Sequence, residues 1–438
     1  ILLFLVSCAA PSRLVRKEFR RLENDTLLRR AHVGISVLDG ATGRYLYQYQ
    51  SGKYFVPASN IKIATCYAAL KYLGDSLPAA RFTRYEGALT IIPAGDPTFL
   101  HPAFPQQPLW DFLSRHAGAV QLELGDGPVP YGRGWTWEDF DQSYMPERSA
   151  FPLGGNAVWF RSLADTAAHP RSLSGQDTIV VADDSLLLVE PSFFGSRVYV
   201  STGTTFRRNR SANSFYLDTA DLRNLSAPGR RLAIPYITEN GHTARQALEA
   251  VLQKPVPFRG YRRPATDTVL YSRPLDSVLR PMMHQSDNFL AEQLLLMAGH
   301  EVHGNWNEAT VISSLLRSDL ADLPQKPRWV DGSGLSRYNL FTPDDFVALL
   351  QKMKNEFGME RLKGIFPGPG EGTLKNNYAA LQGRLYAKTG TLSGVVALSG
   401  YLYTKENRLL LFSVLVNNHQ GSATDIRKAV ERVLSAIQ

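Results

Sequence analysis

The sequence predicts an α+β protein (α/β in the broad sense), with one antiparallel sheet that both ends of the chain build and helices that flank it. A hairpin pattern lies near the N-terminus, at residues 33–49, and two strongly apolar strand patterns lie near the C-terminus, at 395–403 and 409–417. From residue 81 to about 262 the predicted strands are short, and Pro, Gly, Trp and Tyr are frequent. We therefore expect a large β-rich insertion within the sheet-forming domain.

The elements follow in order along the chain. Apolar spacing predicts a helix over 13–31, the hairpin strands over 33–38 and 45–49, and a second helix over 57–73. Within the insertion, strands are predicted at 88–93, 178–181, 185–189 and 197–201. Beyond it, helices are predicted at 275–283, 286–298 and 424–437, and strands at 395–403 and 409–417.

These patterns predict a division into domains. Residues 13–80 and 263–438 are expected to fold together as one domain. Residues 81–262 are expected to form the β-rich insertion, as one subdomain or as two nested ones.

The composition excludes several classes of protein. Of 438 residues, 44% are hydrophobic and 20% are charged, which excludes a disordered tail, a collagen-like repeat and a coiled coil. Two cysteines exclude a disulfide scaffold and a cysteine-rich zinc module. Residues 13–30 contribute seven Arg or Lys and three acidic residues to a net charge of +8, and no basic stripe is interleaved with aromatic residues further along. We expect no nucleic-acid partner.

Residues 1–12 are predicted to be the remnant of a leader or a lipoprotein signal. The string Leu5-Val-Ser-Cys8 resembles the bacterial lipobox, in which the cysteine is lipidated and becomes the new N-terminus. The alternative is an ordinary secretory leader that contains a cysteine. Both interpretations predict export to the periplasm, and the first adds a lipid anchor at Cys8. The second cysteine, Cys66, is expected to be a small buried thiol.

A hydroxyl and an amine lie three residues apart at the start of the second predicted helix, in Ser59-Asn-Ile-Lys62. Three residues turn a helix by roughly 300°, so both side chains lie on one face and can form a hydrogen bond. A lysine that is partly desolvated at a helix N-terminus can accept the serine proton. The alternative is a capping serine beside a solvated lysine.

Two more short motifs follow. Ser286-Asp-Asn288 begins a predicted helix, where a hydroxyl and a carboxamide together offer a proton relay and a partner for a peptide amide; helix capping is the alternative. Lys388-Thr-Gly390 precedes the strand at 395–403. On an edge strand, Lys and Thr can recognise a carboxylate while Gly lets a substrate backbone approach, and a β-turn is the alternative.

Together and in this order, the three motifs resemble those of the β-lactamases and penicillin-binding proteins. The sequence is similar in particular to the D-alanyl-D-alanine carboxypeptidases/endopeptidases of the S13 family of low-molecular-mass penicillin-binding proteins, which have a long insertion between the first two motifs. The resemblance covers residues 33–420 and includes further strings: Ala94-Gly-Asp-Pro97, Gly132-Arg-Gly-Trp135, Asp331-Gly-Ser-Gly-Leu-Ser-Arg337, Gly372-Thr-Leu374 and Ala387-Lys-Thr-Gly-Thr-Leu392.

The resemblance implies the fold, the reaction and the site. The fold is a β-lactamase/transpeptidase-like antiparallel sheet flanked by helices, and residues 13–80 and 263–438 form the penicillin-binding catalytic domain. The implied reaction is hydrolysis of peptidoglycan stem peptides ending in D-Ala-D-Ala, or of their D-Ala cross-links, with β-lactams as covalent inhibitors and without a cofactor or metal. The implied catalytic residues are Ser59, Lys62, Ser286 and Asn288, and the implied substrate-binding residues are Lys388, Thr389, Gly390 and Thr391.

Each role follows from the resemblance. Ser59 attacks the carbonyl, and Lys62 takes its proton. Ser286 relays the proton to the leaving amine, while Asn288 orients Lys62 and the substrate amide. Main-chain N–H groups of Ser59 and Thr391 form the oxyanion hole, and water then hydrolyses the acyl-enzyme.

Two rival functions remain at this point. A serine β-lactamase shares the acylation step, and Glu301-Val-His-Gly-Asn305 fits its E-x-x-x-N pattern, but it follows Ser286 too closely and the insertion argues against it. A non-catalytic peptidoglycan-binding scaffold is the second rival, although every motif residue is present. Residues 331–337 are expected to be either a glycine-rich turn or a wall of the active-site cleft. Trp135 and Trp137 are expected in the core of the insertion, and a platform for a ligand is the alternative.

Overall fold

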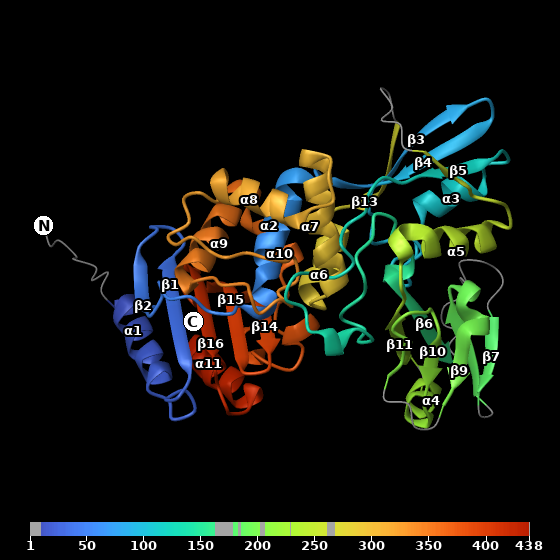
Figure 1. Ribbon diagram of the computed structural model, residues 1–438. Coiled ribbons are helices and arrows are strands. Elements are labelled where there is room, and N and C mark those ends of the chain that lie inside the picture. The colour runs from blue at the N-terminus through green and yellow to red at the C-terminus, as the bar shows by residue number, and fades with distance from the viewer. Residues whose placement is uncertain are drawn as a thin grey trace, which may run out of the picture. The chain divides into compact units, whose positions relative to one another are not determined.

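The computed structural model describes residues 10–162, 178–182, 185–201, 206–227, 229–260 and 268–437. The expected lipid anchor at Cys8 lies outside the described residues. The chain divides into two compact units, both drawn in Figure 1. The first contains Ile1–Ala69, Asp276–Ala291 and Glu308–Gln438, and the second contains Leu70–Leu275 and Glu292–Asn307. The boundaries expected at residues 80 and 262 stay a prediction.

The first unit is built on a five-stranded antiparallel sheet with the order β14-β15-β16-β1-β2. The strands are β1 (His32–Asp39), β2 (Tyr45–Tyr49), β14 (Leu385–Leu392), β15 (Val395–Tyr403) and β16 (Leu409–Asn417). Because β1 pairs along its whole length with β16, the two ends of the chain meet in the middle of the sheet. This confirms the antiparallel sheet expected from both ends of the sequence, with β14 at one edge.

Helices cover both faces of this sheet (Figure 1). The helices of the first unit are α1 (Ala10–Glu23), α2 (Ile61–Tyr72), α6 (Asp276–His284), α8 (Glu308–Arg317), α9 (Pro343–Phe357), α10 (Met359–Ile365) and α11 (Ala423–Ile437), with the short 3-10 helices η1 (Ala58–Asn60), η7 (Gly372–Leu374) and η8 (Ala379–Leu381). The helix α7 (Asn288–His303) begins in the first unit, and from Glu292 onward it belongs to the second.

The sequence of β1 explains how two helical layers pack on one sheet. Alternate side chains of a strand point to opposite faces. Ile35 and Val37 are buried in a hydrophobic core with residues of α1 and α11. On the other face Gly34 leaves room for the Phe55 ring, and Ser36 donates a hydrogen bond of 2.6 Å to Asp344 at the start of α9. The apolar and small residues of β1 therefore alternate because two different layers cover it.

The second unit contains the β-rich insertion. A five-stranded mixed sheet has the order β12-β5-β4-β3-β13, a four-stranded antiparallel sheet has the order β11-β6-β8-β7, and β9 and β10 form a parallel pair. The strands are β3 (Ser76–Tyr85), β4 (Ala88–Pro93), β5 (Val120–Glu123), β6 (Ala157–Ser162), β7 (Thr178–Ala182), β8 (Ser185–Glu190), β9 (Val198–Val200), β10 (Phe215–Leu217), β11 (Arg231–Pro235), β12 (Phe258–Arg259) and β13 (Thr268–Pro274).

Helical segments complete the second unit. The helices are α3 (Pro108–Ser114), α4 (Thr219–Ser226) and α5 (His242–Leu252), with the 3-10 helices η2 (Trp137–Asp139), η3 (Gly154–Asn156), η5 (Ser192–Arg197) and η6 (Glu239–Gly241). The buried residues form two separate hydrophobic clusters, one around the five-stranded sheet and one around the four-stranded sheet.

Two expectations about local structure are wrong. The first helix ends at Glu23 instead of continuing to residue 31, because Asn24 and Asp25 use their side chains to bond the main chain. Such local bonds compete with helical ones and favour turns. Trp137 is 59% exposed, so it does not belong to the core of the insertion.

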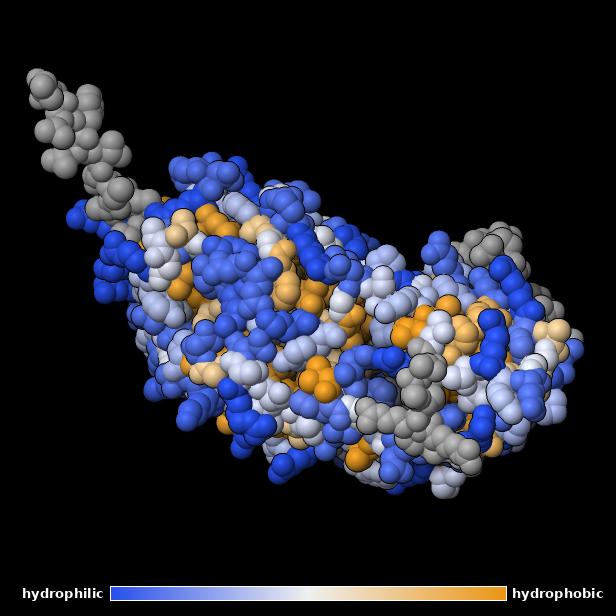
Figure 2. All heavy atoms as spheres, turned by 90° about the horizontal axis from the view of Figure 1, so that it is seen from above, coloured by the Kyte–Doolittle hydropathy of each residue, from blue (hydrophilic) through white to orange (hydrophobic). Residues whose placement is uncertain are grey.

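The described part of the chain contains no helix whose length and hydropathy suit a membrane span. On the face drawn in Figure 2, hydrophobic residues are interspersed among hydrophilic ones. Scattered exposure of this kind is normal for a folded protein.

Candidate functional site

The turn before α2 presents Ser59 in a constrained backbone. Ser59 lies in η1, and the residue before it, Ala58, has a left-handed φ of +49°. A non-glycine residue in this region is strained, so the surrounding structure must hold it there. Asn60 does part of this by donating a hydrogen bond of 2.7 Å to Ser399 of β15. The serine is half-buried and lies two residues before Ile61, the first residue of α2.

The amine of Lys62 is fully buried next to this serine. Its Nζ lies 3.2 Å from Ser59 Oγ, which is within reach for proton transfer. The same Nζ donates hydrogen bonds of 2.7 Å to Asn288 Oδ1 and of 2.7 Å to the main-chain oxygen of Ser333. The three acceptors hold the amine in one place and direct it at the serine hydroxyl.

A second buried lysine organises the other half of the site. Lys388 lies in the edge strand β14, and its Nζ donates hydrogen bonds of 2.9 Å to Ser286 Oγ and of 2.8 Å to the main-chain oxygen of Thr389. Ser286 has a left-handed φ of +59° and stands two residues before the start of α7, which begins at Asn288. Motifs far apart in the sequence thus supply one lysine–serine pair.

Burial and charge both act on Lys388. Removal of the ammonium group from water lowers the pKa of Lys388 well below its ordinary range, and the positive charge of Lys62 lowers it further. The site therefore contains two lysine amines that repel each other when both are protonated. An anionic group that enters such a site gains electrostatic stabilisation from it.

Gly390 and Thr389 extend this arrangement along β14. A Cβ on Gly390 would lie 2.7 Å from the main-chain oxygen of Pro57, so only glycine allows the strand to approach the turn that carries Ser59. The Thr389 hydroxyl is hydrogen-bonded over 2.8 Å to that of Thr373.

Thr391 is placed differently from the other seven predicted residues. It is exposed, and its hydroxyl accepts a hydrogen bond of 2.6 Å from Arg427 of α11. The expected oxyanion role of its main-chain N–H stays a prediction.

Ser333 is a site residue that the motifs did not identify, because it contributes a main-chain oxygen and such an atom has no signature in the sequence. The loop that carries it is held by Asp331, whose carboxylate accepts hydrogen bonds from the N–H groups of Gly334 (2.9 Å) and Ser336 (2.7 Å) and from the side chain of Asn339 (2.7 Å). The glycine-rich turn expected at 331–337 is therefore also a wall of the site.

The features behind the rival functions lie in α7 beyond Asn288. Glu301, which the β-lactamase alternative would need as a base, forms an ion pair of 3.0 Å with Arg81. His300 and His303 lie three residues apart in the same helix, without the four-residue spacing of a metalloprotease motif, and His300 stacks on Trp306. Within the described ranges no three His, Cys, Asp or Glu side chains gather closely enough to hold a metal ion. The sequence-based prediction that no metal or cofactor takes part stays a prediction. Cys66 is fully buried, as expected.

The buried Lys388 makes a prediction about stability and pH. Because its pKa is lowered on folding, the unfolded chain binds the proton more tightly, and the free energy of unfolding should rise as the pH increases toward the ordinary lysine pKa of 10.5. In Lys388→Met this titration is absent. We expect urea denaturation between about pH 7 and pH 9.5 to show that the difference in free energy of unfolding between wild type and the variant grows in favour of wild type by up to about 1.4 kcal/mol per pH unit.

The matched control for this measurement is Lys428→Met, which removes an exposed lysine from α11. The difference in free energy of unfolding between wild type and this variant should change little over the same pH range. A constant difference between wild type and Lys388→Met at every pH would contradict the prediction.

Comparison with known proteins connects this geometry to a family. The sequence model of the D-Ala-D-Ala carboxypeptidase 3 (S13) family matches residues 16–181 and 262–437. A D-alanyl-D-alanine carboxypeptidase from an Actinomadura species is 27% identical over an alignment of 468 positions, gaps included, which covers 93% of this chain and 82% of that protein. A carboxypeptidase DacB from Mycolicibacterium smegmatis is 31% identical over 172 residues, which cover 36% of this chain and 37% of that protein.

Solved structures show the same fold. Penicillin binding protein 4 (dacB) from Haemophilus influenzae superposes with a TM-score of 0.70 at 19% identity, over 95% of this chain and 97% of that one. The solved structure confirms the predicted α+β fold, and the family model and the relatives confirm the predicted D-Ala-D-Ala carboxypeptidase function. The chain belongs to the D-Ala-D-Ala carboxypeptidase 3 (S13) family of serine peptidases.

Proposed function

We propose that Ser59 is the residue that carries the acyl group when this enzyme hydrolyses the D-Ala–D-Ala bond of peptidoglycan stem peptides. The observation that supports this most directly is the 3.2 Å distance between Lys62 Nζ and Ser59 Oγ in a buried setting. A serine hydroxyl is a weak nucleophile unless a base lies within hydrogen-bond reach. Lys62 provides that base, and Asn288 and Ser333 fix its position.

Acylation uses both lysine–serine pairs of the site, Ser59 with Lys62 and Ser286 with Lys388. Ser59 Oγ attacks the carbonyl carbon of the penultimate D-Ala, and its proton passes to Lys62 Nζ. The tetrahedral intermediate collapses as the C–N bond breaks, and the leaving amine takes the proton that Lys62 accepted, relayed by Ser286, which Lys388 holds at 2.9 Å. Water next attacks the ester carbonyl and gives a proton to Lys62, which passes it to Ser59 Oγ as the shortened peptide leaves.

Substrate recognition falls to β14. Lys388 and Thr389 bind the terminal carboxylate, whose negative charge offsets the repulsion between the two amines. Gly390 keeps the strand close to the nucleophile turn. Main-chain N–H groups of Ser59 and Thr391 stabilise the oxyanion, with a contribution of about 2.7–4 kcal/mol for a single donor in known cases.

The carboxypeptidase and endopeptidase reactions share this acylation step. They differ in the leaving amine, which belongs to a free D-Ala in the first and to a cross-linking side chain in the second. A predatory peptidoglycan endopeptidase from Bdellovibrio bacteriovorus has the same overall fold, with a TM-score of 0.50 at 15% identity over 92% of this chain and 91% of that one. The fold therefore accommodates the endopeptidase reaction in a neighbour.

The acyl-enzyme is tested with a labelled penicillin and intact-mass measurement. Wild type should form a long-lived one-to-one adduct and release D-Ala from a peptide ending in D-Ala-D-Ala. Ser59→Ala should lose the adduct and at least about a thousandfold in D-Ala release. Ser226→Ala, which changes an exposed serine at the end of α4, should behave as wild type.

The other outcomes of this experiment identify the rivals. Rapid turnover of the penicillin without a lasting adduct would indicate a serine β-lactamase. Neither adduct nor turnover would indicate a non-catalytic peptidoglycan-binding scaffold. An adduct that persists in Ser59→Ala would overturn the role given to this serine.

The backbone packing around Ser59 gives a second prediction. Gly334 has φ +82°, and a Cβ there would lie 1.9 Å from the main-chain oxygen of Ala58. Gly334→Ala should therefore displace the nucleophile turn and lower the rate of acylation by penicillin at least about tenfold. The matched control is Gly43→Ala in the β1–β2 turn, where φ is +69° and no atom lies within 4 Å.

Both variants carry the cost of a left-handed alanine, about 1–2 kcal/mol. The rate of acylation by penicillin should fall in Gly334→Ala by more than its loss of thermal stability accounts for. In Gly43→Ala the acylation rate should stay at the wild-type value at temperatures where the variant is folded. Equal acylation rates in the two variants would show that the Gly334 contact does not position Ser59.

We also propose that the protein is exported to the periplasm and is lipidated on Cys8, because its substrate belongs to the cell wall and Cys8 stands in a lipobox-like string. Expression of the chain behind a complete lipoprotein leader in cells fed labelled palmitate should label wild type. The label should be absent from Cys8→Ser. Equal labelling of the two forms, or of neither, would contradict the anchor and leave an ordinary secretory leader.

A further inference from the structure

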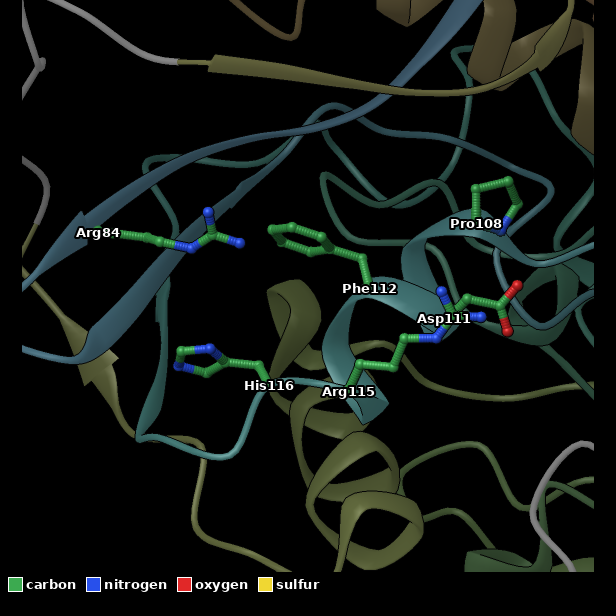
Figure 3. A pocket seen from close by; sticks show the side chains of 6 residues that line it. All are labelled: Arg84, Pro108, Asp111, Phe112, Arg115 and His116. Atoms are coloured by element: carbon green, nitrogen blue, oxygen red, sulfur yellow. The ribbon is translucent and has the colours of Figure 1, made fainter.

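A cavity of about 420 Å³ lies in the second unit, at the end of the β3–β4 hairpin and α3. Its lining is shown in Figure 3 and consists of Arg84, Pro108, Asp111, Phe112, Arg115 and His116. None of these residues takes part in the catalytic site, whose groups all belong to the first unit. The cavity therefore serves a different purpose or none.

Arg84 is held in place by aromatic rings. Its guanidinium carbon lies 5.3 Å from the centroid of the Phe112 ring and 5.4 Å from that of Phe82. The two rings are themselves 4.7 Å apart. Figure 3 shows Arg84 of β3 and Phe112 of α3 pointing toward one another. A guanidinium held against ring faces keeps its in-plane N–H groups available, and within the described chain no carboxylate pairs with it.

Further basic groups surround the same space. Arg115 is exposed at the C-terminal end of α3, and the following residue, His116, has a buried Nε2 without a hydrogen-bond partner among the described residues. Lys254 donates a hydrogen bond of 2.7 Å to the main-chain oxygen of His116, which brings another positive charge to this loop. Asp111 is the single carboxylate in the lining, so basic groups outnumber acidic ones.

We propose that this cavity binds an oxyanion, a carboxylate or a phosphate, carried on a single sugar ring. Arginine forms strong, directional hydrogen bonds to both oxyanions. Pro108 and Phe112 supply an apolar wall for the C–H face of the ring. The volume lies at the low end of the range of ligand pockets, about 300–1,000 Å³, which suits one ring better than an oligosaccharide.

The choice of a sugar rests on the proposed function, because the stem peptides that the enzyme cleaves are attached to a glycan. The cavity would then hold the enzyme on its polymeric substrate through an anionic sugar while the first unit carries out hydrolysis. The oxyanion has two sources in a cell wall: carboxylates of glycan residues that carry no stem peptide, and phosphates on sugar phosphates or wall polymers.

Three small sugars distinguish these chemistries in titration calorimetry or ligand-observed NMR with the whole chain. N-acetylmuramic acid offers a carboxylate, N-acetylglucosamine 6-phosphate offers a phosphate, and N-acetylglucosamine is neutral. The test variant is Arg84→Gln, and the matched control is Arg223→Gln, which removes the same charge from an exposed position in α4.

At least one anionic sugar should bind at least about tenfold more tightly than the neutral one, and Arg84→Gln should weaken it at least about tenfold while Arg223→Gln leaves it unchanged. Preference for N-acetylmuramic acid supports the carboxylate source, and preference for the 6-phosphate supports the phosphate source. Equal Kd values for all three sugars, equal loss in both variants, or no binding at all would overturn the proposal.

Failure here is distinguishable from failure of the proposed function. The three sugars lack D-Ala-D-Ala, and acylation of Ser59 by penicillin is measured independently of them. Arg84→Gln should be acylated at the wild-type rate, which also shows that the variant is folded.

Discussion

Two lysine amines buried in one unit set the conditions for the rest of the catalytic site. Lys62 and Lys388 are both 0% exposed, and a buried ammonium group is costly unless hydrogen-bond acceptors replace its water. The acceptors come from separate parts of the chain: Asn288 and the Ser333 oxygen for one amine, and Ser286 for the other. The nucleophile, the relay serine and the loop at 331–336 are therefore brought together by the same electrostatic requirement.

The backbone around these amines is strained in specific places. Ala58, which directly precedes the nucleophile Ser59, and the relay serine Ser286 both have left-handed φ angles. Such strain persists only where the surroundings are rigid. Rigidity comes from the five-stranded sheet, to which Asn60 bonds the nucleophile turn, and from the Asp331 network that fixes the opposite loop. Gly334 and Gly390 allow these pieces to lie closer together than any side chain would permit.

Much of the fold was predictable because its patterns are local. The strands at 395–403 and 409–417 are nearly continuous apolar runs, and the structure has β15 and β16 at the predicted residues. The length of the first helix was not predictable from apolar spacing alone, since two short polar side chains at its end decide it. Trp137 was misplaced for the opposite reason: a large apolar residue does not by itself reveal whether anything packs on it.

The site itself was predictable only as side chains. Three short motifs named the two lysines, two serines and the asparagine that the structure brings within hydrogen-bond distance. The contacts of the Ser333 oxygen and of Thr373 were not predicted, although both residues lie in strings that resemble the family, at 331–337 and 372–374. A main-chain atom looks the same in every sequence, and a short string does not reveal which distant side chain its threonine contacts. These contacts join residues far apart in the sequence, so they can be identified only once the fold is known.

The pairing of β1 with β16 has a consequence for the order in which the enzyme is synthesised, folds and becomes active. Strand pairs that join distant parts of a chain form late, because a long loop must close before they gain any stability. Ser59 is synthesised early, but Lys388 and the strand that completes the sheet beside β1 come near the end. An incomplete chain therefore contains Ser59 without Lys388 and without the complete sheet, and we expect it to be inactive. Peptidase activity requires that the C-terminal strands have been synthesised and paired.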